Sequence, residues 1–150
     1  MSKDDADAAL QGWKVVHVEG APKVGGGVHW DLLAVFTMNP GDVQVVECEN
    51  PVPRPGQVRV RMLASPINPS DVMTIRGTYG RQPSLPFTPG YEGVGVVEES
   101  GGGVLGALRR NKRVVVLNSI TGNWAEQAVV PAKQVIPVPA SLSVEQAATF

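Results

Sequence analysis

The chain has 150 residues, 43% of them hydrophobic, and its 13 basic and 14 acidic residues leave a net charge of -1. This length suits one domain with a sizeable core, and the balance lacks the basic surplus that binding to a nucleic-acid backbone requires. One cysteine, Cys48, excludes an intramolecular disulfide, and no apolar run is long enough to cross a bilayer.

The first residues are acidic and match neither a secretory signal nor a transit peptide. We expect residues 1–12 to form a flexible tail and residues 13–150 to form the domain. With no targeting signal evident, we expect a protein of the cytoplasm or the mitochondrial matrix that binds no nucleic acid and does not insert into membranes.

Short apolar runs separated by glycine and proline predict many strands joined by turns. In the first half, the predicted strands cover residues 13–20, 31–36, 43–48 and 57–64. The last of these has the clearest alternation, with Val58, Val60 and Met62 on one face and polar residues on the other. This pattern is typical of a half-buried antiparallel strand.

The second half continues the pattern, with little helix. A single helical turn is predicted at residues 70–75 with Ser70 as its N-cap, and Ser143 and Gln146 have capping-box spacing at a short C-terminal helix. The predicted strands cover residues 93–100, 112–118, 124–130 and 134–139. Because the final helix is too short to hold itself in place, we expect the domain to continue beyond this chain.

Three glycines, Gly101, Gly103 and Gly106, have the G-x-G-x-x-G spacing of a dinucleotide-binding turn. That site needs a crossover helix of about ten residues before the next parallel strand, and an acidic residue after it. Residues 107–112 are too few for such a helix, and no acidic residue follows the next strand at the right distance. We interpret the motif as a glycine-rich turn between two antiparallel strands.

Several motifs in fixed order carry a family resemblance: "INPSD" at 67–71, "GTYG" at 77–80 and "LPFTPGYEGVGVV" at 85–97, followed by residues 122–150. Together they resemble the N-terminal catalytic half of the medium-chain dehydrogenase/reductase superfamily. Before Gly56 the resemblance is weaker, and residues 24–30 look like an insertion. It implies a mainly β, GroES-like, partly open β-barrel with few short helices. In the family a Rossmann cofactor domain follows, so we expect this chain to end at the start of the helix leading into it.

The resemblance also bears on zinc. Zinc-bearing members have a cysteine where this chain has Asn68, and Gly-His-Glu where it has residues 90–92, Gly-Tyr-Glu. His17, His29 and Cys48 have no ligand spacing. The resemblance therefore implies the zinc-free branch of enoyl-thioester reductases and quinone reductases, with no zinc and with NADPH bound mainly by the second domain.

In the enoyl-thioester reductases the tyrosine that matches Tyr79 is the catalytic residue. Hydride addition to a conjugated C=C bond leaves an enolate, and a phenol that stays protonated at neutral pH can donate to its oxygen or protonate its carbon. The alternative is a loop tyrosine that only packs against the barrel.

The neighbouring residues leave other interpretations open. Asn68 either contacts the nicotinamide ribose or substrate, or forms a turn before proline. Asp71 is expected to cap the short helix, and Trp124 to pack in the core. Tyr91 departs from the polar residue usual in the family, so no role is carried over to it.

The predicted function is therefore the catalytic-domain part of an NADPH-dependent oxidoreductase that reduces the C=C bond of a 2-enoyl thioester. The alternative within the superfamily is a quinone oxidoreductase. The alternative of another class is a non-catalytic GroES-like module for binding or assembly, against which Tyr79 argues. We expect this chain alone to be inactive, and leave open whether the complete protein is an oligomer.

Overall fold

The structure is a computed structural model that describes residues 30–36, 43–80, 82–84, 86–118 and 122–149. The predicted tail at 1–12, the predicted strand at 13–20, most of the 24–30 insertion, His17 and His29 lie outside the described residues.

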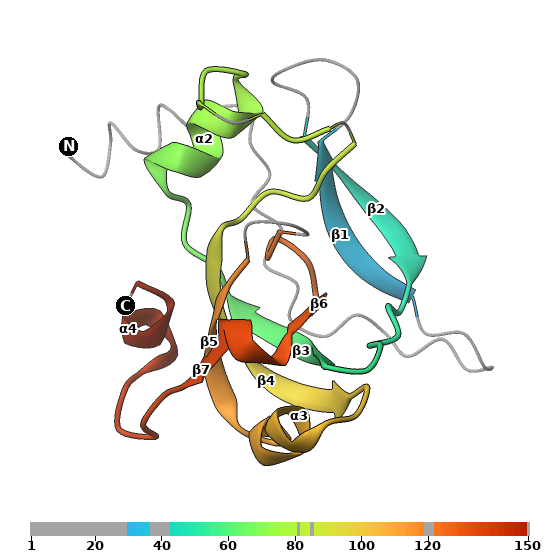
Figure 1. Ribbon diagram of the computed structural model, residues 1–150. Coiled ribbons are helices and arrows are strands. Elements are labelled where there is room, and N and C mark those ends of the chain that lie inside the picture. The colour runs from blue at the N-terminus through green and yellow to red at the C-terminus, as the bar shows by residue number, and fades with distance from the viewer. Residues whose placement is uncertain (1–29, 37–42, 81, 85, 119–121, 150) are drawn as a thin grey trace.

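The described chain is mainly β with few short helices, as the sequence predicts (Figure 1). Its strands are β1 (Trp30–Phe36), β2 (Val43–Glu49), β3 (Gln57–Ala64), β4 (Glu92–Ser100), β5 (Arg113–Leu117), β6 (Gln127–Pro131) and β7 (Val135–Pro137). Its helices are α2 (Pro69–Ile75), α3 (Val104–Arg109), the 3-10 turn η1 (Ala132–Gln134) and α4 (Val144–Ala148).

The strands form two antiparallel sheets. One is the β1–β2 hairpin, and the other has five strands in the order β6-β3-β4-β5-β7. Helices α2 and α3 lie at opposite ends of the larger sheet (Figure 1). Each end of the sheet therefore carries a separate short helix, and the site described below lies at the α2 end.

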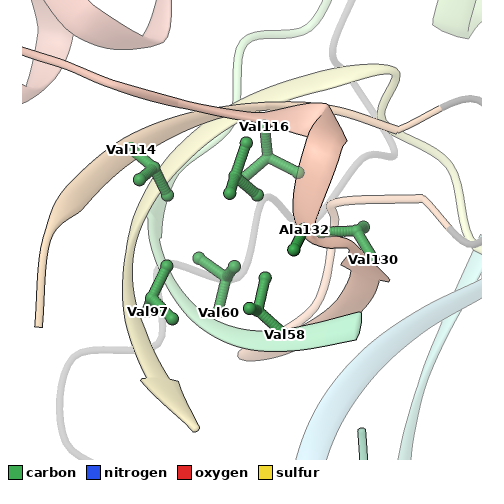
Figure 2. Close-up of a cluster of buried hydrophobic side chains, with 8 residues drawn as sticks. Val58, Val60, Val97, Val114, Val116, Val130 and Ala132 are labelled. Carbon is green, nitrogen blue, oxygen red and sulfur yellow. The ribbon is translucent and has the colours of Figure 1, made fainter. Parts of the chain in front are cut away.

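Strand β3 shows why the large sheet curves around a core. Val58 and Val60 are fully buried, as the alternation predicts, and Met62 packs against the same cluster. Figure 2 shows these valines pointing inward from the curved sheet toward Val114 and Val116. Branched side chains suit strands, and each buried valine contributes about 1.5–3 kcal/mol, so this cluster is the main source of stability.

The polar face of β3 is tied to β4 by two ion pairs. Arg59 bonds Glu99 at 3.0 Å and Arg61 bonds Glu98 at 2.7 Å. Such partly exposed cross-strand pairs each add less than about 1 kcal/mol, so they support the register more than the stability.

The glycine motif joins antiparallel strands, as predicted, but it is more than a turn. Strands β4 and β5 pair antiparallel, and the six-residue helix α3 lies between them. The sequence predicts a glycine-rich turn here, because residues 107–112 are too few for a crossover helix. Gly106 is buried, where a methyl group would collide with the Ser100 hydroxyl, so the glycine lets α3 approach the end of β4.

Two other predicted strands differ from the structure. The strand expected at 124–130 begins only at Gln127, and the one expected at 134–139 is preceded by η1 and ends at Pro137. At the C-terminal end, the predicted capping box is confirmed, with Ser143 and Gln146 bonding reciprocally at 2.9 and 3.1 Å. Buried alanines of α4 pack near Val94, so tertiary contact holds a helix too short to be stable alone.

Gly101 provides a test of why the motif contains glycine. A Cβ at this position would collide with the backbone carbonyls of Pro53 and Arg54. Replacing Gly101 with alanine should therefore lower the free energy of unfolding by about 1–3 kcal/mol, measured by urea denaturation.

The matched control is Gly80→Ala, because a Cβ there meets nothing within 4 Å and Gly80 has no positive φ. This variant should be as stable as the wild type. Equal stability of both variants would contradict the close-approach explanation.

Candidate functional site

Helix α2 is fastened to β4 by one buried carboxylate. Asp71, 1% exposed, accepts the backbone N–H of Asn68 at 2.8 Å with Oδ2 and that of Tyr91 at 3.0 Å with Oδ1. The expectation that Asp71 caps the helix is confirmed. The same side chain also anchors the start of β4, which the sequence did not indicate.

The predicted N-cap was wrong. Asn68 is the N-cap and Ser70 lies inside the helix, because Pro69 occupies the first helical position. Proline suits that position since its fixed φ is helical and no N–H is required there. The backbone carbonyl of Ser70 instead accepts the hydroxyl of Thr74 at 2.7 Å.

Burial raises the pKa of Asp71 above its usual value of 3.8, because the charged form is poorly solvated. Backbone N–H groups of Asn68, Tyr91 and Gly90 act in the opposite direction, and the nearby charge of Glu92 adds to the increase. The hydrogen bonds therefore only partly offset the desolvation of this carboxylate.

Tyr91 is held at three points. Its N–H donates to Asp71, its carbonyl accepts the N–H of Asn118 at 2.7 Å, and its hydroxyl lies 2.9 Å from the Thr74 hydroxyl. No sequence motif assigned a role to Thr74 or Asn118. The only available signal was weak: Thr74 stands four residues after Ser70, the spacing of a hydroxyl-to-carbonyl bond within a helix.

Tyr79 lies just after α2 and is 39% exposed. Its backbone N–H donates to the carbonyl of Met73 at 3.2 Å, and its carbonyl accepts from Gln82 at 2.6 Å. Its ring lies 5.8 Å from that of Tyr91, tilted by 39°. Within the described part of the chain, the hydroxyl of Tyr79 makes no hydrogen bond.

The side chain of Asn68 reaches the same region. Its Nδ2 donates to Glu92 Oε2 at 2.9 Å. The structure therefore brings together both segments in which zinc-bearing members of the superfamily hold ligands. This bond uses one N–H of the amide, so the second N–H is still available for the predicted cofactor contact of Asn68.

The residues at this position do not fit zinc. A protein zinc site takes thiolate, imidazole or carboxylate ligands, whereas Asn68 and Tyr91 offer an amide and a phenol that already bond Glu92 and Thr74. Among the described residues, which include Cys48 in β2, no three His, Cys, Asp or Glu side chains group closely enough to hold a metal.

A cavity of about 20 Å³ lies beneath these residues and is lined in part by Asp71, Thr74, Tyr91 and Asn118. This volume suits one water molecule, and the lining is polar enough to bind one. It is far too small for an organic substrate.

Trp124, expected in the core, is only partly buried and packs against the loop before β4. Its indole lies against Gly90, where any Cβ would collide with the ring, and its Nε1 is 3.4 Å from the carbonyl oxygen of Pro66. Nearby, the buried Asn123 donates to the carbonyl of Val116 at 3.2 Å, and Asn118 to that of Gly122 at 2.8 Å. These bonds hold the segment beside the cavity.

Comparison with known proteins gives consistent matches. The alcohol dehydrogenase GroES-like domain family matches residues 54–140. The synaptic vesicle membrane protein VAT-1 homolog of Mus musculus is 44% identical over 100 residues, 67% of this chain and 24% of that protein. The mitochondrial enoyl-[acyl-carrier-protein] reductase of Homo sapiens is 41% identical over 110 residues, 71% of this chain and 29% of that protein.

Solved structures agree in fold. A putative NADPH:quinone reductase from Bacillus thuringiensis superposes with a TM-score of 0.71 at 36% identity, over 80% of this chain and 37% of that chain. The quinone oxidoreductase from Thermus thermophilus, solved also in complex with NADPH, superposes with a TM-score of 0.67 at 31% identity, over 79% of this chain and 36% of that chain. The chain spans about a quarter of the length of the first curated relatives it matches. The described residues contain no helix with the length and apolar character of a membrane span.

Replacing Asp71 with asparagine tests the anchor. Asparagine has one acceptor oxygen where the carboxylate uses two, so one backbone N–H loses its partner. We expect the free energy of unfolding to fall by about 1–3 kcal/mol. The control is Glu145→Gln, an exposed first-turn acid of α4, which should leave the melting temperature close to that of the wild type.

The raised pKa of Asp71 also predicts a pH dependence. The folded chain keeps this proton at pH values where the unfolded chain has lost it, so the stability from this group is full below 3.8 and falls as pH rises through the raised pKa. The stability advantage of the wild type over Asp71→Asn should narrow across that window. A constant difference from pH 3 to pH 7 would contradict the shift.

The zinc test is direct. Because Asn68 and Tyr91 stand where ligands would be required, the purified chain should hold no stoichiometric zinc after mild dialysis, measured by elemental analysis. One tightly bound zinc per chain would show that other residues form a metal site.

Proposed function

The chain belongs to the alcohol dehydrogenase GroES-like domain family, and on that premise we propose that it is the substrate-side domain of an NADPH-dependent enoyl-thioester reductase. The family match bears out the predicted GroES-like fold and the resemblance to the medium-chain dehydrogenase/reductases. Relatives named as enoyl-[acyl-carrier-protein] reductases and quinone reductases make it part of an oxidoreductase family. The proposed substrate is a 2-enoyl thioester, and the proposed reaction is reduction of its C=C bond.

The free hydroxyl of Tyr79 is the observation that carries this proposal. Tyr79 is an exposed residue and its hydroxyl is unbonded within the described chain, whereas the nearby hydroxyl of Tyr91 is bonded to Thr74. A proton donor for substrate has to be accessible and uncommitted, and of these two phenols Tyr79 is the one that meets both conditions.

The chemistry needs a hydride at the β-carbon and a proton at the α-carbon. NADPH, when bound, supplies the hydride. The negative charge then moves to the thioester oxygen, and a donor placed there stabilises the enolate as it forms. The Tyr79 hydroxyl serves as that donor or delivers its proton to the α-carbon, and it requires no metal.

Asn68 is proposed to contact the nicotinamide side of the cofactor. It lies half-buried beside α2, one amide N–H bonds Glu92, and the amide retains a second N–H that can donate. The larger part of the NADPH site would belong to a second domain, which is why this chain alone is proposed to be inactive. The complete protein is proposed to lie in the cytoplasm or the mitochondrial matrix.

A second candidate is quinone reduction, since the structural neighbours include proteins described as NADPH:quinone reductases. The same hydroxyl could donate to a quinone oxygen as charge develops there. Comparing a short trans-2-enoyl thioester with a quinone as substrates distinguishes the two. Activity with neither, in the presence of NADPH and the cofactor domain, would favour a non-catalytic binding module.

Tyr79→Phe in a protein that includes the cofactor domain tests the proposed role. The substitution keeps the ring and removes only the hydroxyl. Loss of a donor that acts as charge develops should lower kcat by about a hundredfold or more and change KM little. Steady-state kinetics with a short trans-2-enoyl thioester and NADPH measure this.

A melting curve is the control. The ring is kept and the hydroxyl has no hydrogen-bond partner among the described residues, so the melting temperature should not change. Unchanged kcat with a lowered melting temperature would show that Tyr79 is a packing residue.

A further inference from the structure

We propose that Tyr91 is a positioning residue for Tyr79: it holds the Tyr79 ring at the surface while its own hydroxyl is bonded to α2. The expected effect of Tyr91 on kcat rests on the proposed function, but its effect on the position of the Tyr79 ring does not. The inference is carried by four contacts of Tyr91, each to a different partner.

The direction of the Tyr91–Thr74 hydrogen bond follows from proton counting. A threonine hydroxyl has one proton, and that of Thr74 is donated to the carbonyl of Ser70 at 2.7 Å. In the 2.9 Å contact Thr74 is therefore the acceptor and Tyr91 the donor. The phenol proton of Tyr91 is thus committed to α2.

The backbone of Tyr91 is fixed as firmly as its hydroxyl. The N–H is bonded to the buried Asp71 and the carbonyl to the N–H of the buried Asn118. Because the backbone and the hydroxyl of Tyr91 are both bonded, its ring cannot turn away without breaking a hydrogen bond. Tyr91 is therefore a rigid surface at the end of the cavity.

The side chain of Tyr79 has no comparable anchor. Its backbone N–H and carbonyl are bonded to Met73 and Gln82, but its hydroxyl makes no hydrogen bond among the described residues. Tyr79 lies in a short loop between Gly77, which has a φ of 71°, and Gly80, and its N–H shares the Met73 carbonyl with the N–H of Thr78. Its ring contacts that of Tyr91 at a centroid distance within the usual range of aromatic pairs. The direction of the Tyr79 hydroxyl therefore depends on Tyr91.

The chain suits a direct test because it contains two tyrosines. In the 150-residue chain labelled with 3-fluorotyrosine, every Tyr91 variant leaves one fluorine signal, that of Tyr79. Tyr91→Leu removes the neighbouring ring, so the Tyr79 signal should move toward its value in urea and its nitration by tetranitromethane should accelerate. Tyr91→Phe keeps the ring, so the signal should stay close to that of the wild type.

Two further variants keep the test decisive. Thr74→Val removes the acceptor but leaves both rings, so nitration of Tyr91 should accelerate; this variant carries the test if Tyr91→Leu does not fold. Val114→Ala destabilises the sheet core instead of this site, and the Tyr79 signal should be unchanged. An unmoved Tyr79 signal in Tyr91→Leu, or unchanged nitration in Thr74→Val, overturns the proposal.

Activity of the complete protein adds a second measurement. Tyr91→Leu should lower kcat by about tenfold to a hundredfold with little change in KM, because the donor is misplaced. Tyr91→Phe should restore kcat to within about fivefold of wild type, since only one hydrogen bond is lost. If Tyr91→Phe is as inactive as Tyr79→Phe, Tyr91 is itself the proton donor and the proposal is wrong. If Tyr79→Phe is fully active, the proposed function fails while the fluorine result stands.

Discussion

The carboxylate of Asp71 joins two segments that are 20 residues apart in the chain, and the geometry of the site depends on it. One oxygen closes the first turn of α2 and the other fixes the start of β4. A single carboxylate can do this because it has acceptor sites on both oxygens, whereas a serine or threonine cap has one oxygen. Burying the charge is unfavourable, and backbone N–H groups from both segments partly compensate for it.

From this anchor the site builds outward in order of decreasing burial. Asp71 and Thr74 are buried, Tyr91 is partly buried and Tyr79 is exposed. Tyr91 links these groups: its backbone N–H is bonded to Asp71, its hydroxyl to Thr74, and its ring contacts that of Tyr79. This order suits the donor role proposed for Tyr79, which requires an exposed group on a rigid support.

The glycine motif shows how one spacing can serve two purposes. In a dinucleotide site the glycines allow a phosphate to approach the backbone. Here Gly101 allows the backbone of Pro53 and Arg54 to approach, and Gly106 allows α3 to pack on the end of β4. The antiparallel pairing of β4 with β5 excludes the parallel crossover that a dinucleotide site requires. The length of the connection was sufficient to predict this, since a parallel crossover has a minimum length.

The sequence by itself determined the β class, the alternation in β3, the antiparallel connection after β4 and the capping box of α4, because each depends on residues close together in the chain. Its ordered motifs also pointed to the family and to Tyr79. Only the tertiary structure decided that Asn68 caps α2, that α3 is helical, and that Asp71 bonds Tyr91. The last of these joins distant segments, and no local pattern encodes which buried donor a carboxylate will meet. The roles of Thr74 and Tyr91 follow from the same cause, since their hydroxyls become partners only after α2 packs beside β4.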